Sequence, residues 1–384
     1  MDLWITAEHS VKILHTIYDD VDNPWCGGGG ALRAIEINRR LAKRHKVKML
    51  VGNYPGALRE ESKHGIQILR QGSSANYALS RLSFTAQASI TLAKEQFDLW
   101  VYNFSAFSPI LASSRLRRKC VLEFFHLLAD HALKKRPLLG LPAIVMERYT
   151  LQAYRQLVGI SPSVIQQIRK FAKVDGLQLV YTGVNQTCFE ITGTEEDYIL
   201  YFGRLDTYTK GIDLLLQAFA RVVSKHRNVR LLLAGRGTDQ RINELRSLSA
   251  ELGMKEQVEI LGPVSDDRKQ QLFGGAIFNC MPSRYEGWGI AAIEASAAGK
   301  AIIGTRIPGL TDAIKHNKTG LLAEPENIES LADAMDLLLS DPELRSRLGS
   351  SGKKWAQRFT WDRVARDQEL VYEKILARTG GFSD

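Results

Sequence analysis

The sequence predicts an α/β fold made of two consecutive doubly wound domains, and three observations lead to this prediction. Short apolar runs alternate with segments of helical periodicity, which is typical of strand-helix-strand units and a parallel sheet. The alternation begins again near residue 177. The chain of 384 residues is long enough for two domains of about 150 residues each.

The first half contains one series of strands and helices. The apolar run 11–18 is the expected first strand, and the helix expected at 31–44 has Leu32, Ile35 and Leu41 roughly on one face. Ser161 before Pro162 predicts the start of a helix that runs to residue 172, because serine caps helices and proline suits their first turn. Further strands are expected at 46–51, 98–102, 121–125 and 157–160.

The second half repeats the pattern and ends in a long amphipathic segment, 343–377, that is expected to be helical. Strands are expected at 177–181, 198–202, 229–234, 258–261, 276–280 and 301–303, and helices at 212–223, 242–252 and 289–298. We therefore expect an N-terminal domain at 1–180, a C-terminal domain at 181–364 and a C-terminal helix at 365–384, a candidate for packing back on the first domain.

The composition excludes several protein classes. With 45% hydrophobic and 24% charged residues, the chain is neither disordered, nor collagen-like, nor a small disulfide scaffold. No apolar run reaches the ~18 residues that span a bilayer, and the N-terminus does not resemble a secretory signal. The four cysteines lie far apart without zinc-ligand spacing, so we expect buried thiols, no structural metal and a cytoplasmic location.

The basic excess lies in the first half of the chain, where residues 1–180 carry a net charge of +11 while the remainder carries −2. It gathers at 115–119 and at 134–136, and the second cluster precedes the apolar stretch 137–141. Basic residues beside apolar ones are attracted to an anionic membrane surface, so we expect no nucleic-acid partner but keep peripheral attachment to the inner face of a membrane open. A solvated basic face on a core helix explains the same residues equally well.

Four glycines, 27–30, lie between the first expected strand and the first expected helix. Glycines there let backbone N–H groups approach an anion closely, with the positive end of the helix behind them. A flexible loop is the alternative explanation. A dehydrogenase is disfavoured, because the second expected strand ends in Gly52 and Asn53 without the acidic residue that holds a nicotinamide cofactor's ribose.

Two cations follow the strand at 198–202. Arg204 comes after Gly203, and Lys210 precedes the next helix, an arrangement suited to neutralising a leaving diphosphate. Surface arginines and lysines are common, so this pair is weak evidence by itself. The strand at 229–234 ends in Gly235, a second turn that brings backbone close to a ligand.

The segment 282–295 gives the sharpest signal, because Glu286 and Glu294 flank a Gly-x-Gly turn between a strand and a small-residue helix. Glu286 is expected on the loop. Glu294 is expected about two turns into the helix, where a carboxylate among alanines needs a hydrogen-bonding partner; a solvated helix residue is the alternative. Backbone N–H groups at the helix start are expected to bind an anion. The residues expected to bind the donor there are Gly287, Trp288, Gly289, Ile290 and Ala291.

With these motifs the chain resembles family 4 of the retaining glycosyltransferases, which have the GT-B fold of two Rossmann-like domains facing a central cleft. The resemblance spans nearly the whole chain. Its most specific part is Glu286-x7-Glu294 followed by Ala298-Gly299. The other matching motifs are Gly27–Gly30, Gly203-Arg204-Leu205 with Lys210-Gly211, Thr182-Gly183-Val184-Asn185, and Gly320-Leu321-Leu322, which looks like the family's turn after the sheet.

The resemblance implies a role for each matching residue in the second half. Arg204 and Lys210 look like the pair that stabilises the donor's diphosphate. Glu286 looks like the residue that touches the transferred sugar, and Glu294 like the ligand of the nucleotide's ribose. Val264 falls where a backbone group reads the base.

In the first half, Gly28 and Gly29 correspond to the two glycines that line the donor and acceptor sides of the cleft. His126 falls where the family places a sugar-contacting histidine, with His131 as a nearby competitor. One departure is Asn185, which stands where many relatives have Asp; asparagine suits that turn equally well.

The resemblance therefore implies a hexosyltransferase that moves a sugar from a UDP- or GDP-linked donor to the hydroxyl of a glycan, a lipid-linked or a small-molecule acceptor. It implies retention at the anomeric carbon and no metal or other cofactor. A nucleotide-sugar epimerase or phosphorylase on the same fold is an alternative, as is a non-catalytic protein that binds nucleotide sugar or membrane.

Overall fold

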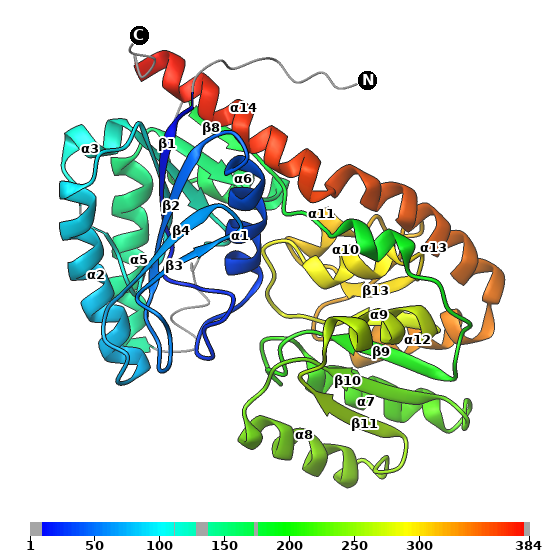
Figure 1. Ribbon diagram of the computed structural model, residues 1–384. Helices are drawn as coiled ribbons and strands as arrows, with labels where there is room; N and C mark the ends of the chain where they lie inside the picture. Colours follow the sequence, from blue (N-terminus) through cyan, green and yellow to red (C-terminus); the bar gives the residue numbers. More distant parts are fainter. Residues whose placement is uncertain (1–9, 111, 128–136, 173–175, 380–384) are drawn as a thin grey trace. The chain divides into compact units, whose positions relative to one another are not determined.

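The computed structural model describes residues 10–110, 112–127, 137–172 and 176–379, and the chain divides into two compact units (Figure 1). The first unit comprises Met1–Thr182 together with Trp361–Asp384, and the second comprises Gly183–Thr360. Each unit contains its own sheet. The prediction of two α/β domains is thus confirmed, although the first unit also takes in the C-terminal segment.

Within the described residues, the first unit has a sheet with the strand order β3-β4-β2-β1-β5-β6-β7-β8. Only β3 runs antiparallel to its neighbour. Neither β3 nor β4 was predicted from the sequence, and β3 gives no apolar run because it contains no apolar residue. The strands are β1 Lys12–Thr16, β2 Lys46–Gly52, β3 Glu60–Lys63, β4 Ile66–Gln71, β5 Leu99–Asn103, β6 Cys120–Phe124, β7 Gln156–Gly159 and β8 Gly176–Leu179.

Side-chain caps mark where several helices of the first unit begin. Asn76 accepts from the N–H of Leu79 at the start of α2, and Ser161 accepts from the N–H of Val164 at the start of α6, as its Ser-Pro sequence predicts. No helix in the described ranges combines the length and the apolar composition needed to cross a membrane. The helices are α1 Gly29–Leu41, α2 Tyr77–Lys94, α3 Ser114–Arg118, α5 Pro137–Ala153, α6 Pro162–Arg169 and α14 Trp361–Thr379.

The sheet of the second unit is entirely parallel in the described part of the chain, with the order β11-β10-β9-β12-β13-β14. The order reverses between β9 and β12, which makes this pair the switch point where open α/β sheets bind ligands. One expectation was wrong. Leu321 belongs to a buried strand paired with β13 and not to a turn after the sheet. The strands are β9 Tyr198–Phe202, β10 Arg230–Ala234, β11 Val258–Gly262, β12 Phe278–Met281, β13 Ile302–Thr305 and β14 Leu321–Ala323.

Helices of the second unit pack on this sheet through apolar faces. In α7, Leu215, Leu216 and Phe219 are fully buried in the unit's core. The helices are α7 Ile212–Val223, α8 Asp239–Glu251, α9 Asp266–Gly275, α10 Ile290–Ala297, α11 Leu310–Ala313, α12 Ile328–Ser340 and α13 Pro342–Ala356, with short 3-10 turns at Gln186–Glu190 and Gln357–Phe359.

The C-terminal segment 343–377 is helical over most of its length, as its periodicity predicts. It is divided into α13 and α14, and α14 begins at Trp361, not at 365. Phe359 causes this break, because its carbonyl accepts from the N–H of Val184 and its buried ring packs edge-on against Trp288. The helix α14 belongs to the first unit, where Asp362 pairs with Arg40 of α1 at 2.5 Å.

A buried ion pair joins three elements of the first unit. Arg33 of α1 contacts Glu123 of β6 at 2.7 Å, and both side chains are 1% exposed. The same guanidinium donates to the amide oxygen of Gln368 in α14 at 2.8 Å. A charge removed from water needs such partners, so these bonds attach α14 to α1 and to the sheet.

The buried network continues from the carboxylate of Glu123 to a histidine of β1. Asn103 donates to Glu123 at 2.8 Å, and the Asn103 oxygen accepts from Nε2 of His15. Asn38 donates to Nδ1 of His15 at 2.6 Å, which assigns the proton of the neutral ring to Nε2. Burial lowers the pKa of His15, although Glu123 acts in the opposite direction.

Replacing Glu123 by glutamine should destabilise the first unit strongly. The variant leaves Arg33 buried without a carboxylate, so the free energy of unfolding should fall by about 3–5 kcal/mol in denaturant titrations. Glu329→Gln is the matched control, because its pair with Arg221 is 76% and 49% exposed and should contribute at most about 1 kcal/mol. Equal losses in the two variants would show that the buried pair is not a stabilising contact.

His15 should make stability depend on pH below neutrality. The unfolded histidine titrates near 6.5 while the folded one titrates lower, so the unfolded chain binds more protons and stability falls as the pH drops through 6.5. His15→Gln should reduce the slope between pH 7 and pH 5 by at most about 1.4 kcal/mol per pH unit. The exposed His64→Asn variant should keep the wild-type slope. An unchanged slope in His15→Gln would contradict this assignment.

Candidate active site

Two loops of the second unit come together at the carboxyl ends of β9 and β12. They are 203–211 and 282–289, and each follows one strand of the switch point. The N–H of Arg284 donates to the carbonyl of Thr209 at 3.1 Å. Gly211 has a φ of 65° and lies so close to the carbonyl of Pro282 that a side chain would collide with it. The loops are therefore held side by side by backbone contacts.

These loops pair Lys210 with Glu286. The Lys210 ammonium contacts Oε1 of Glu286, and the two side chains are 16% and 12% exposed. The hydroxyl of Ser283 donates to the same carboxylate oxygen at 3.0 Å. The structure thus brings together two residues that lie 76 positions apart and that the sequence analysis selects separately.

Arg284 anchors the second loop, a role that the sequence analysis did not assign. Its guanidinium makes two bonds to Asp213 of α7, at 2.7 and 2.8 Å, and also pairs with Glu326 at 2.5 Å. It stacks over the ring of Tyr208 at 4.4 Å. These carboxylates outweigh the effect of burial and raise the pKa of Arg284. Its position two residues before Glu286 was the sequence signal, because its partners come from distant segments.

Arg204 is the most exposed charged group of the expected site. Its side chain is 59% exposed, and its guanidinium lies 3.9 Å from Asp206, beyond hydrogen-bonding distance. Asp206 is buried and accepts from the N–H of Thr209 at 3.1 Å, so it holds the loop 203–211 in shape. Arg204 therefore presents its charge to solvent at the end of β9.

Gly203, Gly235 and Val264 each follow a strand at this same edge, after β9, β10 and β11. Gly235 has a φ of 134°, and a Cβ there would overlap the carbonyl oxygen of Gly203. The turns after β9 and β10 can therefore pack together only through glycine. Val264 is half-buried in the loop that leads to α9.

The start of α10 forms the end of the second loop, with Gly287, Trp288, Gly289, Ile290 and Ala291 in sequence there. Gly289 is the N-cap residue in a left-handed conformation with a φ of 79°, and no side chain caps the helix. The first N–H groups of a helix have no partner within it, so an uncapped start can donate to an anion. The Trp288 side chain is buried against Phe359 and is not presented to a ligand.

Glu294 lies in α10 and is only 4% exposed, so it is not a solvated helix residue. Its carboxylate pairs with Lys269 of α9 at 2.7 Å. The lysine is the partner that a buried carboxylate requires, and the sequence analysis did not identify it. Both glutamates of the motif are thus paired with a lysine from another element.

The residues expected in the first half lie in the first unit. Gly28 precedes α1 and Gly29 is its first residue, while the exposed His126 follows β6. All three therefore belong to a different unit from Arg204 and Glu286. The competing histidine, His131, and the basic cluster 134–136 lie outside the described residues.

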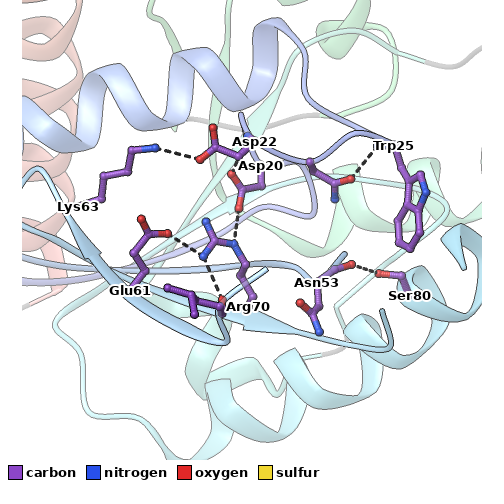
Figure 2. A network of polar contacts seen from close by, with 10 residues as sticks. Asp20, Asp22, Trp25, Asn53, Glu61, Lys63, Arg70 and Ser80 are labelled. Carbon is purple, nitrogen blue, oxygen red and sulfur yellow. Dashed lines mark hydrogen bonds and ion pairs between the residues drawn. The ribbon is translucent and has the colours of Figure 1, made fainter. Parts of the chain in front are cut away.

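The loop before the glycine run is held by buried ion pairs, which Figure 2 shows. Asp20 contacts Arg70 of β4 at 2.8 Å, and Arg70 also contacts Glu61 at 2.8 Å. Next to them Asp22 pairs with Lys63 at 2.9 Å. These contacts give the segment that leads to Gly28 a defined backbone.

Within the described ranges, no group of three or more His, Cys, Asp or Glu side chains is arranged so that it could hold a metal ion. The expectation of buried thiols is wrong for Cys26, which is half-buried and donates to Asp19 at 2.8 Å. Burial raises the pKa of the Cys26 thiol to about 12, with Asp19 acting in the same direction.

Two families of known proteins match the chain. "Glycosyltransferase Family 4" matches residues 27–187, and "Glycosyl transferases group 1" matches residues 189–355. An uncharacterized glycosyltransferase of Methanocaldococcus jannaschii is 32% identical over 59% of this chain and 61% of its own length. The D-inositol 3-phosphate glycosyltransferase of Jonesia denitrificans is 33% identical over 47% of this chain. The latter match covers 43% of that protein, so the chain spans about half the length of these relatives.

Solved structures show the same fold at low sequence identity. Sucrose-phosphate synthase of Thermosynechococcus elongatus has a TM-score of 0.82 and 21% identity, covering 96% of this chain and 100% of its own. HepE of Anabaena, solved with UDP and glucose, has a TM-score of 0.72 and 16% identity, covering 95% of this chain and 100% of its own. With two parallel-sheet α/β units and family matches over both halves, the chain belongs to glycosyltransferase family 4 and has the GT-B type of fold.

Proposed function

We propose that this protein is a retaining hexosyltransferase that uses a UDP- or GDP-linked sugar as donor. The observation that carries the proposal is the pairing of Lys210 with Glu286 at the switch point, next to the exposed Arg204 and the uncapped start of α10. Cations and free amide groups at one sheet edge are suited to a diphosphate. The binding of UDP and glucose by HepE supports this choice of donor.

The barrier in such a transfer lies in separating a diphosphate from an oxocarbenium-like sugar. Arg204, Lys210 and the amide groups of α10 would stabilise the negative charge on the departing diphosphate, so the proposal includes no metal cofactor. Glu286 is the carboxylate next to Lys210 and would contact the transferred sugar. The departing phosphate takes the proton of the acceptor hydroxyl as that hydroxyl attacks from the same face, which gives retention.

The acceptor is proposed to be a glycan, a lipid-linked glycan or a small hydroxyl compound, and one surface favours a lipid-bound acceptor. In α5, Leu141, Val145 and Tyr149 are 60%, 61% and 56% exposed and recur every four residues, which places them on one helix face. Arg117 of α3 donates to the hydroxyl of Tyr149 at 3.5 Å, so a helix with three arginines contacts one end of this stripe. An apolar stripe next to cations fits peripheral attachment to an anionic membrane.

Screening a panel of nucleoside diphosphates and their sugars for thermal stabilisation tests the proposed donor. A ligand at a hundred times its dissociation constant stabilises the folded state by about 2.7 kcal/mol, so a raised melting temperature with UDP, GDP or one of their sugars is expected. No stabilisation by any of them would contradict the proposal. Consumption of the donor sugar without any acceptor would instead indicate an epimerase or phosphorylase.

Arg204→Ala should lower turnover much more than nucleotide affinity. Removing one preorganised group that stabilises developing charge costs roughly 10²–10³-fold in kcat, because the charge on the diphosphate grows in the transition state. Release of the nucleoside diphosphate would measure turnover, and calorimetry would measure its affinity, which should weaken about tenfold or less. Arg221→Ala, in an exposed ion pair on α7, is the control. A variant at Arg204 with full turnover would refute this role.

Charge reversal in α3, whose Arg117 contacts Tyr149 of the α5 stripe, should weaken membrane binding. Each basic residue near an anionic surface contributes about 1 kcal/mol, so Arg115→Glu with Arg118→Glu should lower sedimentation with phosphatidylserine vesicles at least about tenfold. Val145→Asp should act in the same direction through the apolar stripe. Reversing the exposed Lys255 and Lys318 of the second unit is the matched control. If the α3 variants sediment like the wild type, this surface is not the membrane contact.

A further inference from the structure

Lys269 is a half-buried lysine to which neither the sequence motifs nor the proposed mechanism gives a role. It lies in α9, and its ammonium contacts Oε1 of Glu294 at 2.7 Å. The Lys269 side chain is 21% exposed and that of Glu294 is 6% exposed. An ion pair this far from solvent is costly to form, so it is not a default feature of a helix surface.

Lys269 contacts both β9 and α10, the two elements next to the proposed donor site. Its ammonium lies 5.0 Å from the ring centre of Phe202 and 6.0 Å from that of Phe273, at cation–π distances. Phe202 is the last residue of β9, directly before Gly203 and Arg204. Lys269 therefore contacts the strand that ends in the diphosphate-binding loop and the helix that contains Glu294.

The charge of Lys269 is set by its partner. Burial by itself would lower the pKa of the ammonium, but Glu294 outweighs burial and raises it. Among the described side chains, Lys269 is the one that bonds to the carboxylate of Glu294, and it uses a single oxygen, Oε1. An ionised carboxylate can accept several further hydrogen bonds, so Oε2 keeps the capacity to accept from hydroxyl groups.

We propose that Lys269 is a positioning residue for nucleotide binding: it holds Oε1 of Glu294 so that Oε2 accepts hydrogen bonds from the hydroxyls of the donor's ribose. This inference rests on the proposed function, because it needs a ribonucleotide at the end of β9. Without the ammonium, Glu294 is a buried carboxylate that has lost its cation. The carboxylate must then reorient toward water or take up a proton, and either change removes the prepared acceptor.

Lys269→Met keeps an unbranched apolar side chain of similar length and removes the ammonium with its contacts to Glu294 and the Phe202 ring, so it is the first variant to test. Calorimetric titration would compare UDP and GDP with 2′,3′-dideoxy-UDP and 2′,3′-dideoxy-GDP. A hydrogen bond to a charged group changes a dissociation constant by a factor of roughly ten to a hundred. For whichever of UDP and GDP the wild type binds more tightly, the variant should therefore have a dissociation constant at least about tenfold higher. It should bind the dideoxy form as the wild type does, because the ribose hydroxyls are then absent.

Comparing the two nucleotide forms separates positioning from a merely structural role. Equal weakening for the ribo and dideoxy forms would overturn the proposal, because Lys269 would then act on the diphosphate or on the fold. Unchanged ribonucleotide binding would overturn it as well. If the wild type binds no nucleoside diphosphate at all, the proposed function itself fails. This outcome differs from the two above, in which the wild type binds nucleotide but the role of Lys269 is wrong. Lys225→Met is the matched control, since Lys225 pairs with Asp336 in the same unit and is 64% exposed.

Two further variants keep the test decisive if Lys269→Met is too unstable to study. Lys269→Arg retains a cation and should keep most of the preference for the ribo form over the dideoxy form. Lys269→Met combined with Glu294→Gln removes both buried charges together and should fold, because no charge is left without its partner. This double variant should show no preference between the ribo and dideoxy forms. A retained preference there would contradict the assignment of Glu294 and Lys269 to the ribose.

Discussion

The reversal of strand order between β9 and β12 is the constraint on which the candidate site depends. Strands on either side of this point send their following segments in opposite directions, so the loops 203–211 and 282–289 begin next to each other at one edge of the sheet. Glycines at 211 and 235 permit the close backbone contacts that hold these turns. Without this topology, Lys210 and Glu286 would be two unrelated surface charges.

Charge pairing is the second property of the site. Lys210 pairs with Glu286, and Lys269 pairs with Glu294, so each carboxylate of the motif has a lysine from another element as its partner away from solvent. Arg204 remains exposed. An incoming diphosphate would therefore meet Arg204 and the start of α10 first, and would then compete with Glu286 for Lys210. The site is electrostatically prepared for an anion without holding an unpaired buried cation.

Much of this arrangement could be predicted from the sequence, because it follows from local patterns. Apolar runs located β9 at 198–202, and the periodicity of 212–223 located α7. The motif around Glu286 and Glu294 marked the loop and helix start that the structure places at the switch point. The hairpin of β3 and β4 escaped prediction because its outer strand is polar, and the break before α14 escaped because distant contacts of Phe359 cause it.

The partners of the site residues could not be predicted, since no local pattern encodes which side chain meets which. Lys269 reaches Glu294 over 25 positions, and Arg284 reaches Asp213 over 71. The network of Arg33, Glu123 and Gln368 likewise joins three segments that only the folded first unit brings together. Sequence motifs thus pointed to the candidate site residues, whereas the contacts that orient them required the structure.

A crystal structure of the protein grown with UDP or GDP would decide whether the edge between β9 and β12 is where the donor's diphosphate binds. We expect phosphate oxygens within hydrogen-bonding distance of the Arg204 guanidinium and the Lys210 ammonium, with the N–H groups at the start of α10 facing them. Nucleotide density elsewhere on the chain, with Arg204 still directed into solvent, would contradict this interpretation.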